Sequence, residues 1–278
     1  MELDLTAVDL RAVDLTAVDP WIWAMIVGVG IFAGYINTLV GGGTLLVVPL
    51  LIEVVQIPPH LANGTNRLCV AFQAAVALWV LSRGSSDSSE DRAFLKTIPL
   101  PVAILVGVAA LPGAWLASIL PAEELRQTLG FLVLLAVSFF MFSGSVRTGD
   151  AIGEKSVSLS TPGIVMASLA CGVYGGFIGA GIGAFIILMF TTSGVEIEKA
   201  VRWKVFLVWL LSTVSGLYYL FAGHFSLLLA IPLLLAYAIG GFLGGKSIIR
   251  GSEKWLKSAV GVVSASLALL MLFGNPIK

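Results

Sequence analysis

The chain has 278 residues, of which 58% are hydrophobic and only 12% are charged, and its formal net charge is zero. With a mean hydropathy of +1.00, it lies far outside the range of soluble globular proteins. A zero net charge provides no bulk electrostatic attraction to nucleic acid, so no nucleic acid partner is expected.

Several stretches of the chain contain no Asp, Glu, Lys or Arg. They are 21–52, 97–122, 127–146, 156–195 and 205–245. A helix needs about 20 apolar residues to cross a bilayer, so the stretches near 40 residues hold two segments each. None of them alternates apolar and polar residues as the strands of a membrane β-barrel do. The sequence therefore predicts an all-α polytopic membrane protein embedded in the lipid bilayer.

Residues 1–19 precede the first apolar segment and form a predicted acidic N-terminal tail. A five-residue repeat within it matches neither the helix period nor the strand period. The repeat has no basic start and no small-residue cleavage site, so we do not interpret it as a signal peptide.

The apolar segments that follow fall into two sets of five. The first set is 21–40, 44–56, 62–82, 97–119 and 125–144, and the second is 162–180, 183–194, 200–222, 224–249 and 256–274. We predict one integrated transmembrane domain with a first membrane repeat over 20–145, a cytoplasmic linker over 146–161 and a second membrane repeat over 162–275.

Matching residues in the two sets indicate a duplication. At a shift of 131 residues the matched pairs are Pro101 and Pro232, Gly113 and Gly244, Arg126 and Lys257, Gly130 and Gly261, and Phe142 and Phe273. Because each set has an odd number of segments, the second copy enters the membrane upside down. This is the inverted-repeat plan of many secondary transporters.

Basic residues predict the orientation of the chain. The links 83–96, 145–159, 195–204 and 246–257 share one side and carry twelve Lys and Arg residues, against four on the other side. The positive-inside rule therefore places these links in the cytoplasm and both termini outside, for a multi-pass protein of the cell (inner) membrane.

Two glycine-rich breaks interrupt the apolar sequence at matched positions. Their glycines are Gly41, Gly42 and Gly43 in the first break, and Gly181 and Gly183 in the second. A turn at membrane depth leaves backbone N–H groups unpaired, which is tolerated where they face protein, water or a ligand. The helix that follows each break directs its positive end at the turn, which suits an anion, and Thr44 is placed to cap the first helix. The alternative is that the glycines only allow close helix packing.

The segments after the breaks, 44–56 and 183–194, are short. At about 1.5 Å per residue, neither crosses the hydrocarbon comfortably. Two interpretations stay open, since these segments either cross the membrane or fold back as re-entrant half-helices. The charge count does not distinguish them, because a hairpin changes the number of crossings by two.

Polar and basic residues follow each break and complete the predicted anion site. They are Asn63, Gly64, Thr65, Asn66 and Arg67 in the first half, and Arg202 and Lys204 in the second. Hydroxyl and amide groups can hydrogen-bond an oxyanion, while Arg67 supplies charge and a planar fork of donors. The alternative is ordinary anchoring or snorkelling, which is favoured for Arg202, disfavoured for Arg67 and open for Lys204.

Three further polar residues lie within the predicted segments. Asn37 and Gln73 either line a path or tie helices together by hydrogen bonds. Glu53 is a candidate proton carrier or partner for Arg67, or else a solvated end residue. We predict no cofactor and no metal site, and the chain lacks the HExxH and GxSxG motifs of intramembrane proteases, so it is not expected to be an enzyme.

The run Gly-Gly-Gly-Thr-Leu-Leu-Val-Val-Pro at 41–49, followed by 58–67, resembles the TauE/SafE family of sulfite and organosulfonate exporters. The runs 181–185 and 204–206 are similar to the matching block of the second half. This resemblance covers nearly all of residues 20–275 and implies transport of a small sulfur-containing anion, usually outward. The chain departs from the duplicated pattern at Met189, which stands opposite Pro49.

The sequence thus predicts a secondary-active anion transporter that works by alternating access. The resemblance implies that it is a permease or exporter of small sulfur-containing anions such as sulfite or organosulfonates. The expected partners are the small anionic substrate, a coupled proton or sodium ion, and a second copy in a homodimer. Two alternatives are a passive anion channel and a non-transporting membrane scaffold or sensor subunit.

Overall fold

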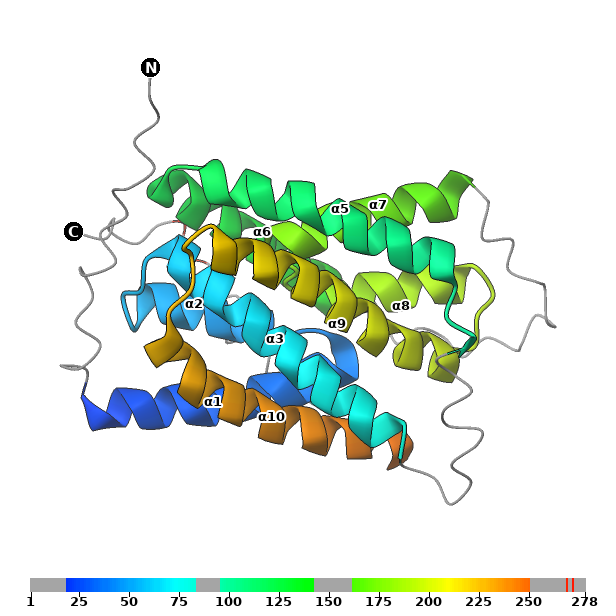
Figure 1. The fold of residues 1–278 in the computed structure, drawn as a ribbon, viewed down its shortest axis with the longest axis horizontal. Coiled ribbons are helices and arrows are strands. Elements are labelled where there is room, and N and C mark those ends of the chain that lie inside the picture. Colours follow the sequence, from blue (N-terminus) through cyan, green and yellow to red (C-terminus); the bar gives the residue numbers. More distant parts are fainter. Residues whose placement is uncertain (1–18, 84–95, 143–161, 251–268, 270–271, 273–278) are drawn as a thin grey trace.

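The computed structural model describes residues 19–83, 96–142, 162–250, 269 and 272. All regular elements in these ranges are α-helices (Figure 1), which confirms the predicted all-α class. They are α1 (Pro20–Val40), α2 (Thr44–Glu53), α3 (Pro59–Leu81), α5 (Leu100–Ile119), α6 (Ala122–Phe142), α7 (Pro162–Phe177), α8 (Ile182–Thr192), α9 (Ile197–Phe221) and α10 (Leu227–Arg250).

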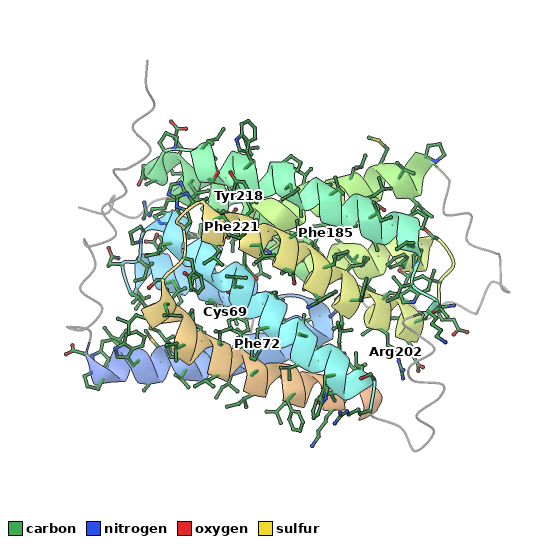
Figure 2. All side chains as sticks on the ribbon, in the orientation of Figure 1. Cys69, Phe72, Phe185, Arg202, Tyr218 and Phe221 are labelled. Carbon is green, nitrogen blue, oxygen red and sulfur yellow. The ribbon has the colours of Figure 1, made fainter. Side chains whose placement is uncertain are left out.

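Five helices of the described ranges are long and apolar enough to cross a membrane, namely α1, α3, α5, α9 and most of α10. Large apolar side chains project outward from them, including Phe72 and Phe221 (Figure 2). Phe221 is 86% exposed. Exposure of so large an apolar side chain to water is unfavourable, whereas lipid would cover it. The protein is therefore a membrane protein.

The helices begin and end close to the predicted segments. The starts differ by up to three residues, since α3, α6 and α9 begin three residues early, at Pro59, Ala122 and Ile197, and α5 and α10 begin three residues late. A proline fits the first helical turn because its missing N–H would have no partner there. The predicted linker 146–161, the predicted segment 256–274 apart from residues 269 and 272, and all but the last residue of the tail lie outside the described residues.

Six helices lie side by side in the order α1, α10, α3, α9, α5 and α7 (Figure 1). If the two proposed copies are exchanged, so that α1 takes the place of α7, α3 of α9 and α5 of α10, the same order results, read from the opposite end. In Figure 1, α1, α3 and α10 run from left to right, whereas α5, α7 and α9 run from right to left. An inverted repeat would produce this arrangement, and the repeat itself stays a prediction.

Small residues allow the outer helix pairs to approach closely. A Cβ atom on Gly240 would lie 2.2 Å from the carbonyl oxygen of Ile31, between α10 and α1. On the other side, a Cβ on Gly113 would lie 2.0 Å from the carbonyl oxygen of Val173, between α5 and α7. Such contacts let helices associate where lipid provides no hydrophobic driving force.

The helices α2 and α8 are short, with 10 and 11 residues. At about 1.5 Å per residue, each reaches about halfway across a hydrocarbon core of about 30 Å. The end of α2 contacts the start of α6 through Glu53 and Arg126, at the same side of Figure 1 where α1 begins. This geometry favours the re-entrant interpretation, in which α1–α2 and α7–α8 are hairpins that enter from opposite ends.

We name the two ends by their residues. The histidine end, on the left of Figure 1, is where α3 begins and where α9 connects to α10. His60 lies in the first turn of α3 and His224 in the α9–α10 connection. The basic end, on the right, holds the start of α9 with Arg202 (Figure 2).

Candidate functional site

The tips of the two hairpins meet through glycine. A Cβ atom on Gly41 would lie 2.3 Å from the Cα of Gly183, and one on Gly183 would lie 2.6 Å from the Cα of Gly41. Gly41 also has a φ of 85°, and Gly179 and Gly181 in the second break have φ values of 58° and 72°. These positions need glycine both for the left-handed turn and for the close backbone contact.

Replacing Gly183 with alanine should therefore destabilise the protein. The added methyl group has no room at the tip contact, and overpacking of this kind costs about 1–3 kcal/mol of unfolding free energy. Gly28→Ala is the matched control, because nothing lies within 4 Å of its Cβ position in α1. Thermal unfolding in detergent should show a loss of stability for Gly183→Ala only. Equal stability of the two variants would contradict a close contact of Gly183 with Gly41.

Both breaks leave backbone N–H groups without a backbone acceptor. In the described part of the chain this holds for Gly42, Gly43 and Thr44 at the start of α2, and for Gly181 and Gly183 at the start of α8. The predicted capping role of Thr44 is wrong, because Gly43 is the N-cap residue and no side chain caps the helix. The Thr44 hydroxyl instead accepts a hydrogen bond from Asn66 Nδ2 at 3.3 Å.

Arg67 lies against the second break. Its side chain is only 1% exposed, and a Cβ on Gly179 would lie 2.4 Å from its Nη1 atom. The Nε and Nη2 atoms have no hydrogen-bond partner. Both ion pairs found among the described residues belong to Arg126, so no described carboxylate compensates the charge of Arg67. A buried charge of this kind is costly unless a counter-ion binds.

Lys204, at the matched position of the second half, is paired differently. Its ammonium group is buried and donates to the carbonyl oxygens of Asn37, at 3.3 Å, and Thr38. These carbonyls end α1, where a positive charge complements the helix dipole. The structure therefore brings Lys204 to the first break, as a side chain that ties α9 to the end of α1.

At the end of α7, uncharged groups take the role that Lys204 has at the end of α1. The carbonyl oxygen of Phe177 accepts hydrogen bonds from Asn63 Nδ2 at 2.7 Å and from the Tyr219 hydroxyl at 3.1 Å. Arg67 is not needed there as a donor. Two matched cations thus differ, since Lys204 is satisfied by protein carbonyls and Arg67 is not.

Three tyrosines surround this site and were missed by sequence reasoning. Tyr174, Tyr219 and Tyr237 are within electrostatic range of the Arg67 charge. The Tyr237 hydroxyl donates to Asn66 Oδ1 at 2.7 Å, and the Tyr174 hydroxyl donates to the carbonyl oxygen of Ala180 at 2.5 Å. The sequence offered one sign of them, since each tyrosine places a hydroxyl group inside an apolar stretch. A buried tyrosine hydroxyl usually has a hydrogen-bond partner.

The family model described as Sulfite exporter TauE/SafE matches residues 26–271. The chain belongs to this family.

Relatives of this TauE/SafE protein match nearly their whole length. A "Probable membrane transporter protein ORF9" of Sinorhizobium sp is 27% identical, over 90% of this chain and 92% of the relative. A "Probable membrane transporter protein YdhB" of Bacillus subtilis is 28% identical, over 88% and 96%. No solved structure matches the chain. The resemblance seen in the sequence is confirmed, and the protein is a membrane transporter of the TauE/SafE family.

Three of the residues predicted for the anion site have other surroundings in this TauE/SafE protein. The Thr65 hydroxyl accepts a hydrogen bond from the backbone N–H of Ser226 at 3.0 Å. A Cβ on Gly64 would lie 2.0 Å from the carbonyl oxygen of His224, so Gly64 allows close packing. Arg202 lies near the basic end (Figure 2). The structure does not bring these three residues to the breaks.

Asn37 and Gln73 form a buried network between α1 and α3. Asn37 Nδ2 donates to Gln73 Oε1 at 2.6 Å, and Gln73 Nε2 donates to the Thr38 hydroxyl at 2.5 Å. Of the two interpretations that the sequence left open, this geometry favours a tie between helices.

Glu53 pairs with Arg126 at the histidine end, and not with Arg67. The two contacts are Arg126 Nε to Oε1 at 2.8 Å and Nη2 to Oε2 at 3.0 Å. The side chains are 1% and 9% exposed for Arg126 and Glu53, so the pair is largely shielded from solvent, and Glu53 is not available to the central site. This two-bond pair connects the end of the first hairpin to α6.

His60 and His224 stack on each other at the histidine end, with ring centroids 4.9 Å apart. His60 Nε2 lies 2.9 Å from the carbonyl oxygen of Leu120, which precedes α6. These contacts join α3, the α5–α6 connection and the α9–α10 connection. In the described ranges no group of three or more His, Cys, Asp and Glu side chains is placed to hold a metal ion.

The histidine end should make stability depend on pH. Burial first, and the neighbouring His60 second, lower the pKa of His224 from 6.5 to about 4. Between these values the unfolded chain binds a proton that the folded chain does not, so stability falls as pH drops from 6.5 towards 4 and levels off below. Thermal unfolding of wild type and His224→Gln across this pH range tests the prediction, because the variant should lose part of the slope of stability against pH. An unchanged slope would contradict the assignment.

Proposed function

We propose that this TauE/SafE protein is a secondary-active transporter of small sulfur-containing oxyanions, such as sulfite or organosulfonates, and that Arg67 binds the anion. The observation that supports this most strongly is the guanidinium itself, which is buried, has two unpartnered nitrogens and has no carboxylate partner among the described residues. A guanidinium presents a planar fork that suits two oxygens of one anion.

The breaks support the same site. Each half-helix begins with N–H groups that lack a backbone acceptor, at Gly42 to Thr44 and at Gly181 and Gly183. Free N–H groups at a helix start, together with the positive end of its dipole, favour an anion. The contact of Gly41 with Gly183 joins both starts to one region.

The proposed mechanism is alternating access around this region. Each hairpin enters from a different end, so movement of one half against the other would expose the anion first to one side and then to the other. The basic end would face the cytoplasm by the positive-inside rule, and export would run from that end to the histidine end. Coupling to a proton or sodium gradient would drive the export of the anion.

Uptake of radiolabelled sulfite into proteoliposomes tests the proposal. Uptake should saturate, respond to an imposed proton or sodium gradient and be inhibited by sulfonates. Arg67→Ala should abolish it, whereas Arg83→Ala should not, because Arg83 lies exposed after α3 against the ring of Trp79. Unchanged kinetics in Arg67→Ala would exclude Arg67 as a ligand, and single-channel currents without coupling would indicate a passive channel.

A further inference from the structure

A second unsatisfied group lies next to Arg67. Asn63 Oδ1 is fully buried and has no hydrogen-bond partner. Residues four apart on a helix lie on one face, so Asn63 and Arg67 are neighbours on α3. Both also contact the same part of the second hairpin, Asn63 through the carbonyl of Phe177 and Arg67 through Gly179. The site thus contains free donors and, beside them, a free acceptor.

The hydrogen-bond pattern determines which atom of Asn63 is free. Nδ2 donates to the carbonyl oxygen of Phe177 at 2.7 Å and to the Tyr219 hydroxyl at 3.1 Å. Rotating the amide by half a turn would place Oδ1 against the Phe177 carbonyl, where two acceptors would face each other. The unpartnered atom is therefore the oxygen, which can only accept.

No neighbouring hydroxyl group donates to this oxygen. The Tyr219 proton is directed at the carbonyls of Phe177 and Gly176, at 3.1 and 3.3 Å. Tyr237 donates to Asn66, and Tyr174 donates to Ala180. A buried acceptor left without a donor is costly, so a donor from outside the described residues is expected.

We propose, on the basis of the transport function above, that the substrate is an oxyanion that carries its own hydrogen-bond donor, such as hydrogensulfite or a hydroxyalkanesulfonate. The sulfur-bound oxygens accept from Arg67, and the hydroxyl group of the ligand donates to Asn63 Oδ1. A fully deprotonated anion such as sulfate offers only acceptors and leaves Asn63 unpaired. The two free groups together therefore select for protonation state or a hydroxyl group as well as for charge.

Isosteric ligand pairs measure this selection. Isethionate and propanesulfonate have the same number of heavy atoms and the same charge, and differ by a hydroxyl in place of a methyl group. A second pair, 3-hydroxypropanesulfonate and butanesulfonate, places the hydroxyl or methyl group one carbon farther from the sulfonate group. Titration calorimetry on the purified protein should give a dissociation constant about 10- to 100-fold lower for the hydroxyl member of at least one pair.

Asn63→Leu is the matching variant. It removes the acceptor at similar volume, so the dissociation constants within each pair should become about equal, while propanesulfonate still depends on Arg67. If this variant does not fold, the ligand pairs still decide the question on the wild-type protein.

The outcomes separate the two proposals. Equal affinity within both pairs, with binding lost in Arg67→Met, would overturn the donor requirement and leave the transport proposal in place. No binding of any of the four sulfonates or of sulfite to wild-type protein would overturn both.

Discussion

Arg67→Met should raise the unfolding temperature in anion-free buffer and, at the same time, abolish stabilisation by anions. The variant replaces a buried guanidinium that has no described carboxylate partner with an apolar side chain of similar length. Replacing buried charges with apolar groups is often neutral or stabilising, by about 1–4 kcal/mol. Wild-type protein should instead gain about 2.7 kcal/mol when sulfite is present at about one hundred times its dissociation constant.

Thermal unfolding in detergent, with and without sulfite, measures both effects. Arg83→Met is the matched control, since it removes an exposed arginine after the same helix. It should unfold like wild type and keep the sulfite response. A less stable Arg67→Met protein that sulfite still stabilises would contradict an anion site at this residue.

Arg126→Met should reduce the unfolding free energy by about 3–5 kcal/mol, the usual cost of removing one partner of a buried ion pair. The variant leaves the Glu53 carboxylate, 9% exposed, without the cation that holds it at 2.8 Å. Removing both charges in Glu53→Leu/Arg126→Met should restore most of the loss, because no buried charge then stays unpaired.

The control for this pair is Lys199→Met, at an exposed position in the first turn of α9. Its effect should stay within about 0.5 kcal/mol. Chemical denaturation of the four proteins in detergent compares them directly. A double variant no more stable than Arg126→Met would mean that packing by Arg126, and not charge pairing, stabilises the histidine end.

Much of the fold follows from the sequence because a bilayer limits the choices. A spanning helix needs about 20 apolar residues, so segment positions could be taken from uncharged stretches. The helices α2 and α8 were expected to be short for the same reason. The glycines of the breaks were recognisable because a turn at membrane depth needs residues without a side chain.

The roles of the cations depended on tertiary contacts that spacing does not reveal. Arg67 and Lys204 occupy matched positions, but Lys204 meets the end of α1, 166 residues away at Thr38. The partner of Glu53 lies 73 residues away in α6. Asn63 and Tyr219, which together satisfy the end of α7, are 156 residues apart. A local pattern contains no information about such distant partners.

The difference between the two halves has a functional consequence. Where Lys204 donates to backbone carbonyls, it stabilises the first hairpin tip. Where Asn63 and Tyr219 satisfy the second tip, Arg67 stays free to bind a ligand. Under the proposed duplication and anion site, one of the two matched cations would serve the structure and the other would bind the anion.

Anomalous diffraction from crystals grown with selenite would test the anion site most directly. Selenite resembles sulfite, and the anomalous scattering of its selenium atom shows directly where the anion is bound. We predict a selenium peak beside Gly179, with selenite oxygens about 3 Å from Arg67 Nε and Nη2. A peak at Arg202 or at other basic residues of the basic end, with none at Arg67, would contradict a central site.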